Sequence, residues 1–214
     1  MLNINKSTIE AYKKMNVPFN LLSQEEGSKN LAIMLPGAGY TAQAPLFHYS
    51  TEIFLNRSFD VLEVNYRYND EAYDDFSMEE LSEAIKYDVK TVLDKVLKEN
   101  AYENFYLIGK SLGTIALSSE LARDEFQNAK AVWLTPLIQR DDVLDAMAGS
   151  KNQGLCFIGD QDRCYIEERF KQVENNPNIV SSLIPGADHS LELKEDVLDS
   201  IDVLKNVISG IEKF

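Results

Sequence analysis

Short apolar runs alternate along the chain with longer segments in which apolar residues recur every three or four positions. Runs that are apolar almost throughout are typical of strands covered on both faces. Such runs predict strands at residues 30–35, 59–66, 104–109, 130–135, 154–159 and 178–184. Residues 17–22 predict a further strand, at an edge or strand start, because Pro18 lacks an amide donor.

The segments between these runs predict helices. The clearest has apolar residues at helical spacing from Leu81 to Leu97, with Glu79 and Glu80 in its first turn. The last segment places Leu198, Ile201, Leu204 and Ile208 on one face, which predicts a terminal helix that closes the domain.

Alternation of strands and helices predicts an α/β fold with a mostly parallel sheet of about six to seven strands and helices on both faces. No internal repeat or linker interrupts it, so residues 1–214 are predicted to form a single domain.

Charge limits the partners. The formal net charge is −14, from 21 basic and 35 acidic residues, which disfavours nucleic acid and anionic membranes. Residues 1–14 lack the apolar core of a signal peptide, and no run approaches the roughly 18 apolar residues of a membrane span. We therefore expect a cytoplasmic protein that acts on a small molecule. The sequence does not indicate its oligomeric state.

The two cysteines, Cys156 and Cys164, form no CxxC motif and are too few for a disulfide framework or a zinc site. We expect reduced, structural cysteines.

The stretch GKSLG, residues 109–113, follows a predicted strand and precedes a helix-like segment. In an open parallel sheet, ligands gather at the carboxyl ends of the strands. A GxSxG sequence at such a corner is typical of a nucleophile elbow, which raises the hydroxyl of Ser111 above the sheet edge. The alternative is a glycine-bounded turn in which the serine only caps the helix.

A serine hydroxyl needs a base and a group that orients the base. Where the serine stands on a nucleophile elbow, the acid follows it along the chain and the histidine follows the acid. His189 therefore qualifies as the base, and His48 is expected at the surface or in packing. Asp162 follows a strand and is the preferred acid, with Asp160 in reserve. The pair Asp141 and Asp142 opens a helix-like stretch, where carboxylates need no catalytic explanation.

An oxyanion hole would need two amide donors. The first is Leu112, the residue after the serine. The second should come from the loop PGAGYTAQ, with Ala38 preferred and Gly39 or Tyr40 left open.

Together, PGAGY, GKSLG, GDQD and GADH resemble the oxyanion, nucleophile, acid and histidine loops of the α/β-hydrolase superfamily, in its small esterase-like or dienelactone-hydrolase-like members. The resemblance covers the chain from about residue 17 and implies a Ser111, Asp162, His189 triad without a metal or organic cofactor. Pro36 departs from the pattern, because many members have a histidine there. Only a short lid-like segment fits at about residues 136–153, which implies a nearly uncapped cleft.

Two nucleotide-binding motifs are incomplete. A phosphate-binding P-loop ending in GKS would need glycine where Asn104 stands. GAGYTA fits a dinucleotide pattern, but Pro45 interrupts the early helix and Glu63 lies too early in its strand to meet a ribose.

These residues predict a serine hydrolase of the carboxylesterase or thioesterase type. Gly39, Tyr40, Lys110 and Leu137 are candidate substrate contacts, Lys110 toward a substrate carboxylate and Leu137 in an acyl pocket. The alternatives are a small-ligand receptor or regulatory scaffold on the same fold, and an acyltransferase or peptidase with the same triad.

Overall fold

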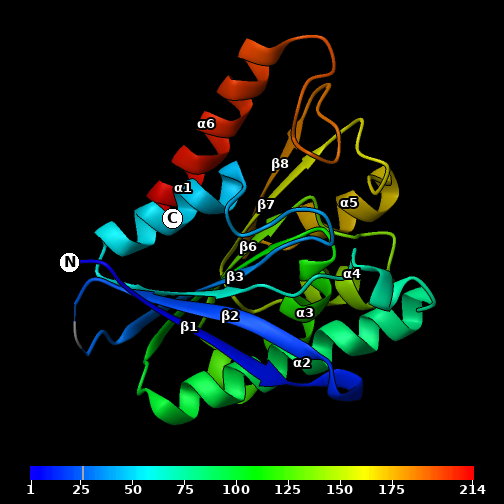
Figure 1. The fold of residues 1–214 in the computed structure, drawn as a ribbon. Helices are drawn as coiled ribbons and strands as arrows, with labels where there is room; N and C mark the ends of the chain where they lie inside the picture. Colours follow the sequence, from blue (N-terminus) through cyan, green and yellow to red (C-terminus); the bar gives the residue numbers. More distant parts are fainter. Residues whose placement is uncertain (26) are drawn as a thin grey trace.

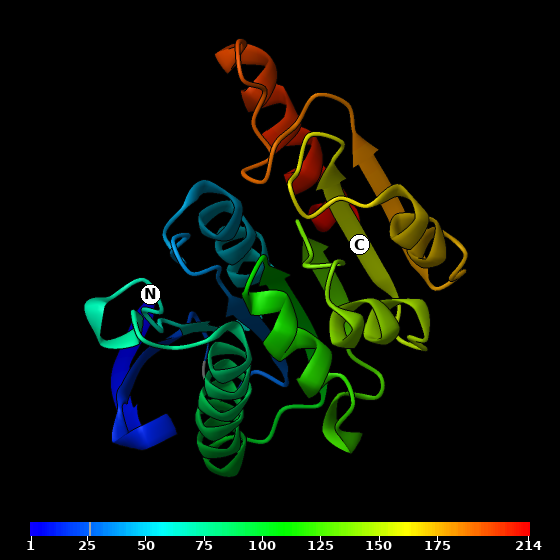
Figure 2. The same ribbon diagram turned by 90° about the vertical axis from the view of Figure 1, so that its right-hand side faces the viewer.

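A computed structural model describes residues 1–25 and 27–214. Its centre is one eight-stranded sheet with strand order β1-β2-β4-β3-β5-β6-β7-β8. Figure 2 shows β1 and β8 at opposite ends of this sheet. The strands are β1 (Asn3–Glu10), β2 (Asn16–Ser23), β3 (Asn30–Leu35), β4 (Asp60–Val64), β5 (Asn104–Lys110), β6 (Lys130–Leu134), β7 (Gly154–Gly159) and β8 (Ile179–Ile184).

Strands β3 to β8 are parallel, whereas β1 and β2 add an antiparallel ribbon to the side of β4. The strand count is therefore higher than the predicted six to seven, because β1 was not predicted. Its residues are mostly exposed, and its polar sequence NINKSTIE gives no core-facing signal. The placing of residues 17–22 at an edge was wrong, since β2 pairs with both β1 and β4.

Helices cover both faces of the sheet (Figure 1). On one face lie α1 (Pro45–Asn56) and α6 (Val197–Lys213), and on the other α2 (Met78–Glu99), α3 (Gly113–Glu120), α4 (Asp141–Ala148) and α5 (Glu167–Glu174). Short 3-10 turns lie at Tyr12–Lys14, Glu71–Tyr73 and Asp124–Phe126. In the described part of the chain, no helix is both long and apolar enough to cross a bilayer.

The central strands are apolar throughout because they face two cores. Along β3, Leu31 and Ile33 pack under α2 and α3, whereas Ala32 and Met34 pack under α1 and α6. Successive strand residues point to opposite faces, so a strand buried on both sides carries no polar alternation. This burial fixes the sheet from which the loops of the site extend.

The terminal helix is present, but its predicted face is only partly buried. Leu204 and Ile208 pack partly against the core, whereas Leu198 is 73% exposed and Ile201 is 54% exposed. The first turns of α6 therefore do not close the domain as predicted.

Asp142 joins α4 to α2. Its carboxylate accepts hydrogen bonds from Arg140 Nε at 2.9 Å and from Lys86 Nζ at 2.8 Å. Partial burial alone would raise the pKa of Asp142, but the bonds from Arg140 and Lys86 outweigh it and hold the pKa at about 2.

Replacing Asp142 with asparagine should lower the free energy of unfolding at pH 7 by about 1 kcal/mol, after allowance for solvent screening. A lowered folded-state pKa stabilises the fold above the ordinary value of 3.8, and this stabilisation is lost as the pH falls toward 2. Urea denaturation across this range should therefore show the gap between Asp142→Asn and the wild type closing with acid. A gap of constant size, or an equal loss in the exposed Asp145→Asn, would contradict the assignment.

Candidate active site

The corner between β5 and α3 holds Ser111. Its φ angle is +50°, in a region that residues with a side chain rarely adopt. A Cβ at position 113 would lie 2.0 Å from the carbonyl oxygen of Leu35, so only glycine lets α3 begin this close to β3. The Ser111 amide donates to the Leu134 carbonyl at 3.0 Å, which ties the corner to β6. This is the strand-to-helix geometry of a nucleophile elbow.

The loop after β8 brings His189 to this corner. Its Nε2 lies 2.7 Å from Ser111 Oγ, and its Nδ1 lies 2.8 and 2.9 Å from the two carboxylate oxygens of Asp162, in the loop after β7. The three side chains come from the carboxyl ends of three parallel strands. The structure thus brings together the three residues of the predicted triad.

The hydrogen-bond partners of His189 indicate which of its two ring nitrogens carries the proton. The Asp162 carboxylate can only accept when ionised, so Nδ1–H donates to it and Nε2 accepts from the Ser111 hydroxyl. Burial alone would raise the pKa of Asp162, but bonds from His189 and the Cys164 amide, with the nearby charge of Lys110, lower it. The acid therefore stays ionised at neutral pH.

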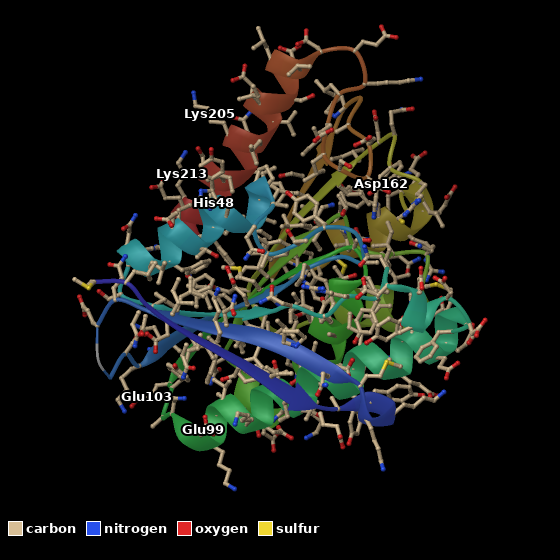
Figure 3. The ribbon with its side chains drawn as sticks, viewed as in Figure 1. His48, Glu99, Glu103, Asp162, Lys205 and Lys213 are labelled. Carbon is tan, nitrogen blue, oxygen red and sulfur yellow. The ribbon has the colours of Figure 1, made fainter. Side chains whose placement is uncertain are left out.

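The other carboxylates and the second histidine lie elsewhere. Asp160 Oδ1 accepts from the Gly186 amide at 2.7 Å and so binds the loop backbone. Asp141 and Asp142 stand in the first turn of α4. Figure 3 shows His48 on α1, away from Asp162, and its ring contacts Tyr49 with centroids 5.0 Å apart.

The loop after β3 reaches the serine through Gly37, where a Cβ would lie 3.2 Å from Ser111 Cβ. The Tyr66 hydroxyl donates to the Pro36 carbonyl and holds the start of this loop. The Tyr40 amide donates to Gly37 O at 3.4 Å, so it is used inside the turn. Ala38 and Gly39 are exposed beside the serine, which leaves their amides as candidate oxyanion donors.

Leu112, the other predicted donor, immediately precedes α3. Amides at the start of a helix have no intrahelical acceptor and are available to an anion. Leu112 therefore stays a predicted oxyanion donor.

Lys110 turns inward and is only 2% exposed. Its Nζ donates to the His189 carbonyl at 2.7 Å and to Thr135 Oγ1 at 2.9 Å, and lies 4.9 Å from the Tyr40 ring centroid. Burial lowers the pKa of Lys110 to about 8. The ammonium thus links the elbow to the loop that carries His189 and to the loop after β3, and this placement does not favour the predicted contact with a substrate carboxylate.

Leu137 is 7% exposed and belongs to the core beneath α3 and α4. Its amide donates to Thr114 Oγ1 at 3.3 Å. The predicted acyl-pocket contact is therefore a packed residue next to the site.

Two hollows flank the loop after β3, and Tyr40 lines both. One, of about 310 Å³, lies toward β2 and β4 and is lined by Gln43, Asn65 and Arg67 among others. The other, of about 560 Å³, lies between the histidine loop, α1 and α6. The two hollows thus lie on either side of the loop that contacts Ser111 through Gly37.

In the described residues, Asp162, Cys164 and His189 form a cluster whose donor atoms all lie within 4.8 Å. Both imidazole nitrogens already have partners, and Cys164 Sγ accepts from Gln139 Nε2 at 3.3 Å. Asp162 and His189 thus belong to the hydrogen-bonded relay with Ser111, whereas the Cys164 thiol is bonded outside it.

Comparison with known proteins shows the family of the chain. Residues 28–214 match the model of an alpha/beta hydrolase domain. The chain belongs to the α/β-hydrolase family. Curated proteins give no match to this hydrolase.

Solved structures share the fold of this hydrolase at low identity. An esterase of Pyrococcus furiosus is 15% identical, with 100% of this chain and 93% of that chain covered and a TM-score of 0.72. A serine hydrolase homologue from Coxiella burnetii is 15% identical, with 96% of both chains covered and a TM-score of 0.70. A serine hydrolase without a lid from Xanthomonas campestris is 16% identical, with 97% of this chain and 94% of that chain covered and a TM-score of 0.68.

Sequence reasoning missed the buried contacts behind the hydrolase site. Thr135, at the end of β6, has a φ angle of +44° and is fully buried, with its hydroxyl on Lys110. Tyr66 was read only as part of a strand. A lysine inside the elbow motif gave a signal for Lys110, but the direction of its side chain is set by tertiary packing.

Proposed function

We propose that the protein is a serine hydrolase that cleaves a carboxylic ester or thioester of a small substrate through an acyl-enzyme on Ser111. The observation that carries this proposal is the unbroken chain of contacts from Ser111 through His189 to Asp162, with distances of 2.7 and 2.8 Å. The esterase and serine hydrolase neighbours support it through their shared fold.

In the first step, Ser111 Oγ attacks the substrate carbonyl while His189 Nε2 takes the hydroxyl proton. The tetrahedral oxyanion would be stabilised by the Leu112 amide and by that of Ala38 or Gly39. The imidazolium then gives its proton to the leaving oxygen or sulfur, which departs and leaves the acyl-enzyme.

In the second step, a water molecule gives its proton to His189 Nε2 and attacks the acyl carbonyl. Ser111 leaves with the proton returned from the imidazolium. Asp162 stays ionised throughout and stabilises the charged imidazole.

Two free, buried cysteines support a reducing location such as the cytoplasm for this reaction.

The site is open, so water can reach an acyl group on Ser111. The Ala38 and Gly39 side of the oxyanion loop is exposed, and the His189 side chain keeps 20% of its surface accessible. An acyltransferase or peptidase would use the same relay. A receptor would need neither a strained serine nor an oriented imidazole.

A panel of activated substrates tests the proposal. The wild type should hydrolyse p-nitrophenyl acetate and a matched thioester with a burst of product, and a fluorophosphonate probe should block both activities. Equal turnover of a matched p-nitroanilide would favour a peptidase. Tight binding of a substrate analogue without any product would favour the receptor.

Lys110 provides a test of how the loops are held. Because its ammonium anchors the backbone of His189, Lys110→Met should lower kcat by about 10- to 100-fold and leave KM for neutral esters within about twofold. Loss of the Lys110 proton weakens these contacts, so kcat of the wild type should fall above about pH 8. This alkaline step should be absent in Lys110→Met.

Thr135→Val serves as the matched control, because it removes one acceptor of Lys110 and leaves the His189 carbonyl contact in place. Its effect on kcat should be smaller than that of Lys110→Met. If Lys110→Met only raised KM for anionic esters, Lys110 would be a substrate contact instead. Thermal unfolding of each variant separates either result from a loss of the fold.

A further inference from the structure

The first turns of α6 expose large apolar side chains. Val197 is 76% exposed, Leu198 73% and Ile201 54%. The helix start is fixed, since the Asp196 carboxylate accepts hydrogen bonds from the amides of Leu198 and Asp199, both at 3.0 Å. Figure 1 shows this end of α6 standing clear of the sheet, near the loop that follows β8. An apolar stripe that is exposed on a capped helix, beside the loop that carries His189, is a candidate binding surface.

A groove of about 560 Å³ lies against these turns. Its lining is mainly apolar, from the start of α1, the histidine loop and α6. Tyr40, Asp188, Ser190, Val197 and Ile201 are among the residues that line it. This volume is typical of small-molecule sites, whose walls are mostly apolar with a few polar groups.

The groove adjoins the loop that carries His189. Asp188 and Ser190 are the immediate neighbours of His189, and Tyr40 ends the turn that begins at Gly37. A molecule in this groove would therefore lie on the imidazole side of the proposed site. His189 Nε2 gives its proton to the leaving group, so the leaving group is the part of an ester that lies on this side.

Charge disfavours the other occupants of such a surface. Residues 188–202 contain six carboxylates and one lysine. A second copy of the chain would bring these carboxylates against one another, and an anionic membrane would be repelled. An uncharged aliphatic chain covers the apolar floor without that cost.

We propose that the groove binds the aliphatic chain of the substrate's leaving group, so that the enzyme prefers esters of medium-chain alcohols to esters of ethanol. This proposal rests on the proposed serine hydrolase function. It adds a chemical class, lipophilic alcohols or thiols, to one side of the scissile bond.

The test compares hydrolysis of ethyl acetate and hexyl acetate, whose acyl groups are the same and whose alkoxide leaving groups have similar reactivity. Burial of the longer chain should raise kcat/KM for hexyl acetate by about tenfold or more. The double variant Val197→Glu with Ile201→Glu should lose this preference and still hydrolyse ethyl acetate at the wild-type rate. Both positions are exposed, so the fold should persist.

Val180→Glu is the matched control, because Val180 is 65% exposed on β8 and does not line the groove. It should keep the preference for hexyl acetate. A parallel series, p-nitrophenyl acetate and p-nitrophenyl hexanoate, changes only the acyl chain, and the double variant should hydrolyse both esters as the wild type does.

Three results would overturn the proposal while leaving the hydrolase function intact. They are no preference for hexyl acetate in the wild type, an effect of the double variant confined to the acyl series, and a dimer in gel filtration that the double variant dissociates without changing the preference. If the wild type hydrolysed none of these esters, the proposed function itself would fall, and this proposal with it.

Discussion

Replacing Ser111 with alanine should lower kcat for p-nitrophenyl acetate by a factor on the order of 10⁵. The substitution removes the hydroxyl that is hydrogen-bonded to His189 Nε2, and an alanine methyl keeps the elbow filled. Steady-state kinetics on purified protein, with active-site titration to exclude contaminating esterase, measures this loss.

Ser119→Ala is the matched control. Ser119 lies on α3, the helix that begins just after the nucleophile, and is only partly buried. This variant should retain the wild-type kcat. Turnover by Ser111→Ala at even a tenth of the wild-type rate would show that another group forms the acyl-enzyme.

The second large effect is expected at the acid. Asp162→Asn should lower kcat by about 10⁴-fold at neutral pH. Both carboxylate oxygens face His189 Nδ1, and Asp162 is only 4% exposed. An asparagine amide can donate to Nδ1 and would favour the tautomer in which Nε2 carries the proton, so the imidazole could no longer accept one from Ser111.

Asp160→Asn separates the two candidate acids. Asp160 binds the Gly186 amide and makes no contact with the imidazole, so its amide variant should keep kcat within about threefold. Measuring kcat for both variants across pH, with circular dichroism as a check of the fold, decides between them. A larger loss in Asp160→Asn than in Asp162→Asn would reverse the assignment.

Much of the fold could be predicted because the central strands are buried on both faces. Strand β3, for example, is apolar at five of six positions. A short run that is apolar almost throughout is typical of a strand buried on both faces. Strand β1 gives no such signal, since its polar residues face solvent and its pairing with β2 is set by the turn between them. The exposed face of α6 could not be predicted either, because periodicity marks an apolar stripe and does not say what covers it.

The three side chains of the proposed triad could be named from the sequence because their loops each follow a strand, and parallel strands end at the same edge. Lys110 shows the limit of that reasoning. Its position inside the elbow motif suggested the substrate side, whereas the contacts with Thr135 and His189 depend on segments 25 and 79 residues away. Local sequence fixes which atoms stand at the corner, and tertiary packing decides where the long side chains turn.

The most direct test of the proposed mechanism is to locate the residue that a fluorophosphonate labels covalently. The protein should be treated with a fluorophosphonate at neutral pH, digested and analysed by tandem mass spectrometry. We predict a single adduct on Ser111 Oγ in the wild type and none in His189→Gln over the same time, because the hydroxyl is then left without its base. An adduct on another residue, or equal labelling of Ser111 without the imidazole, would contradict the proposed relay.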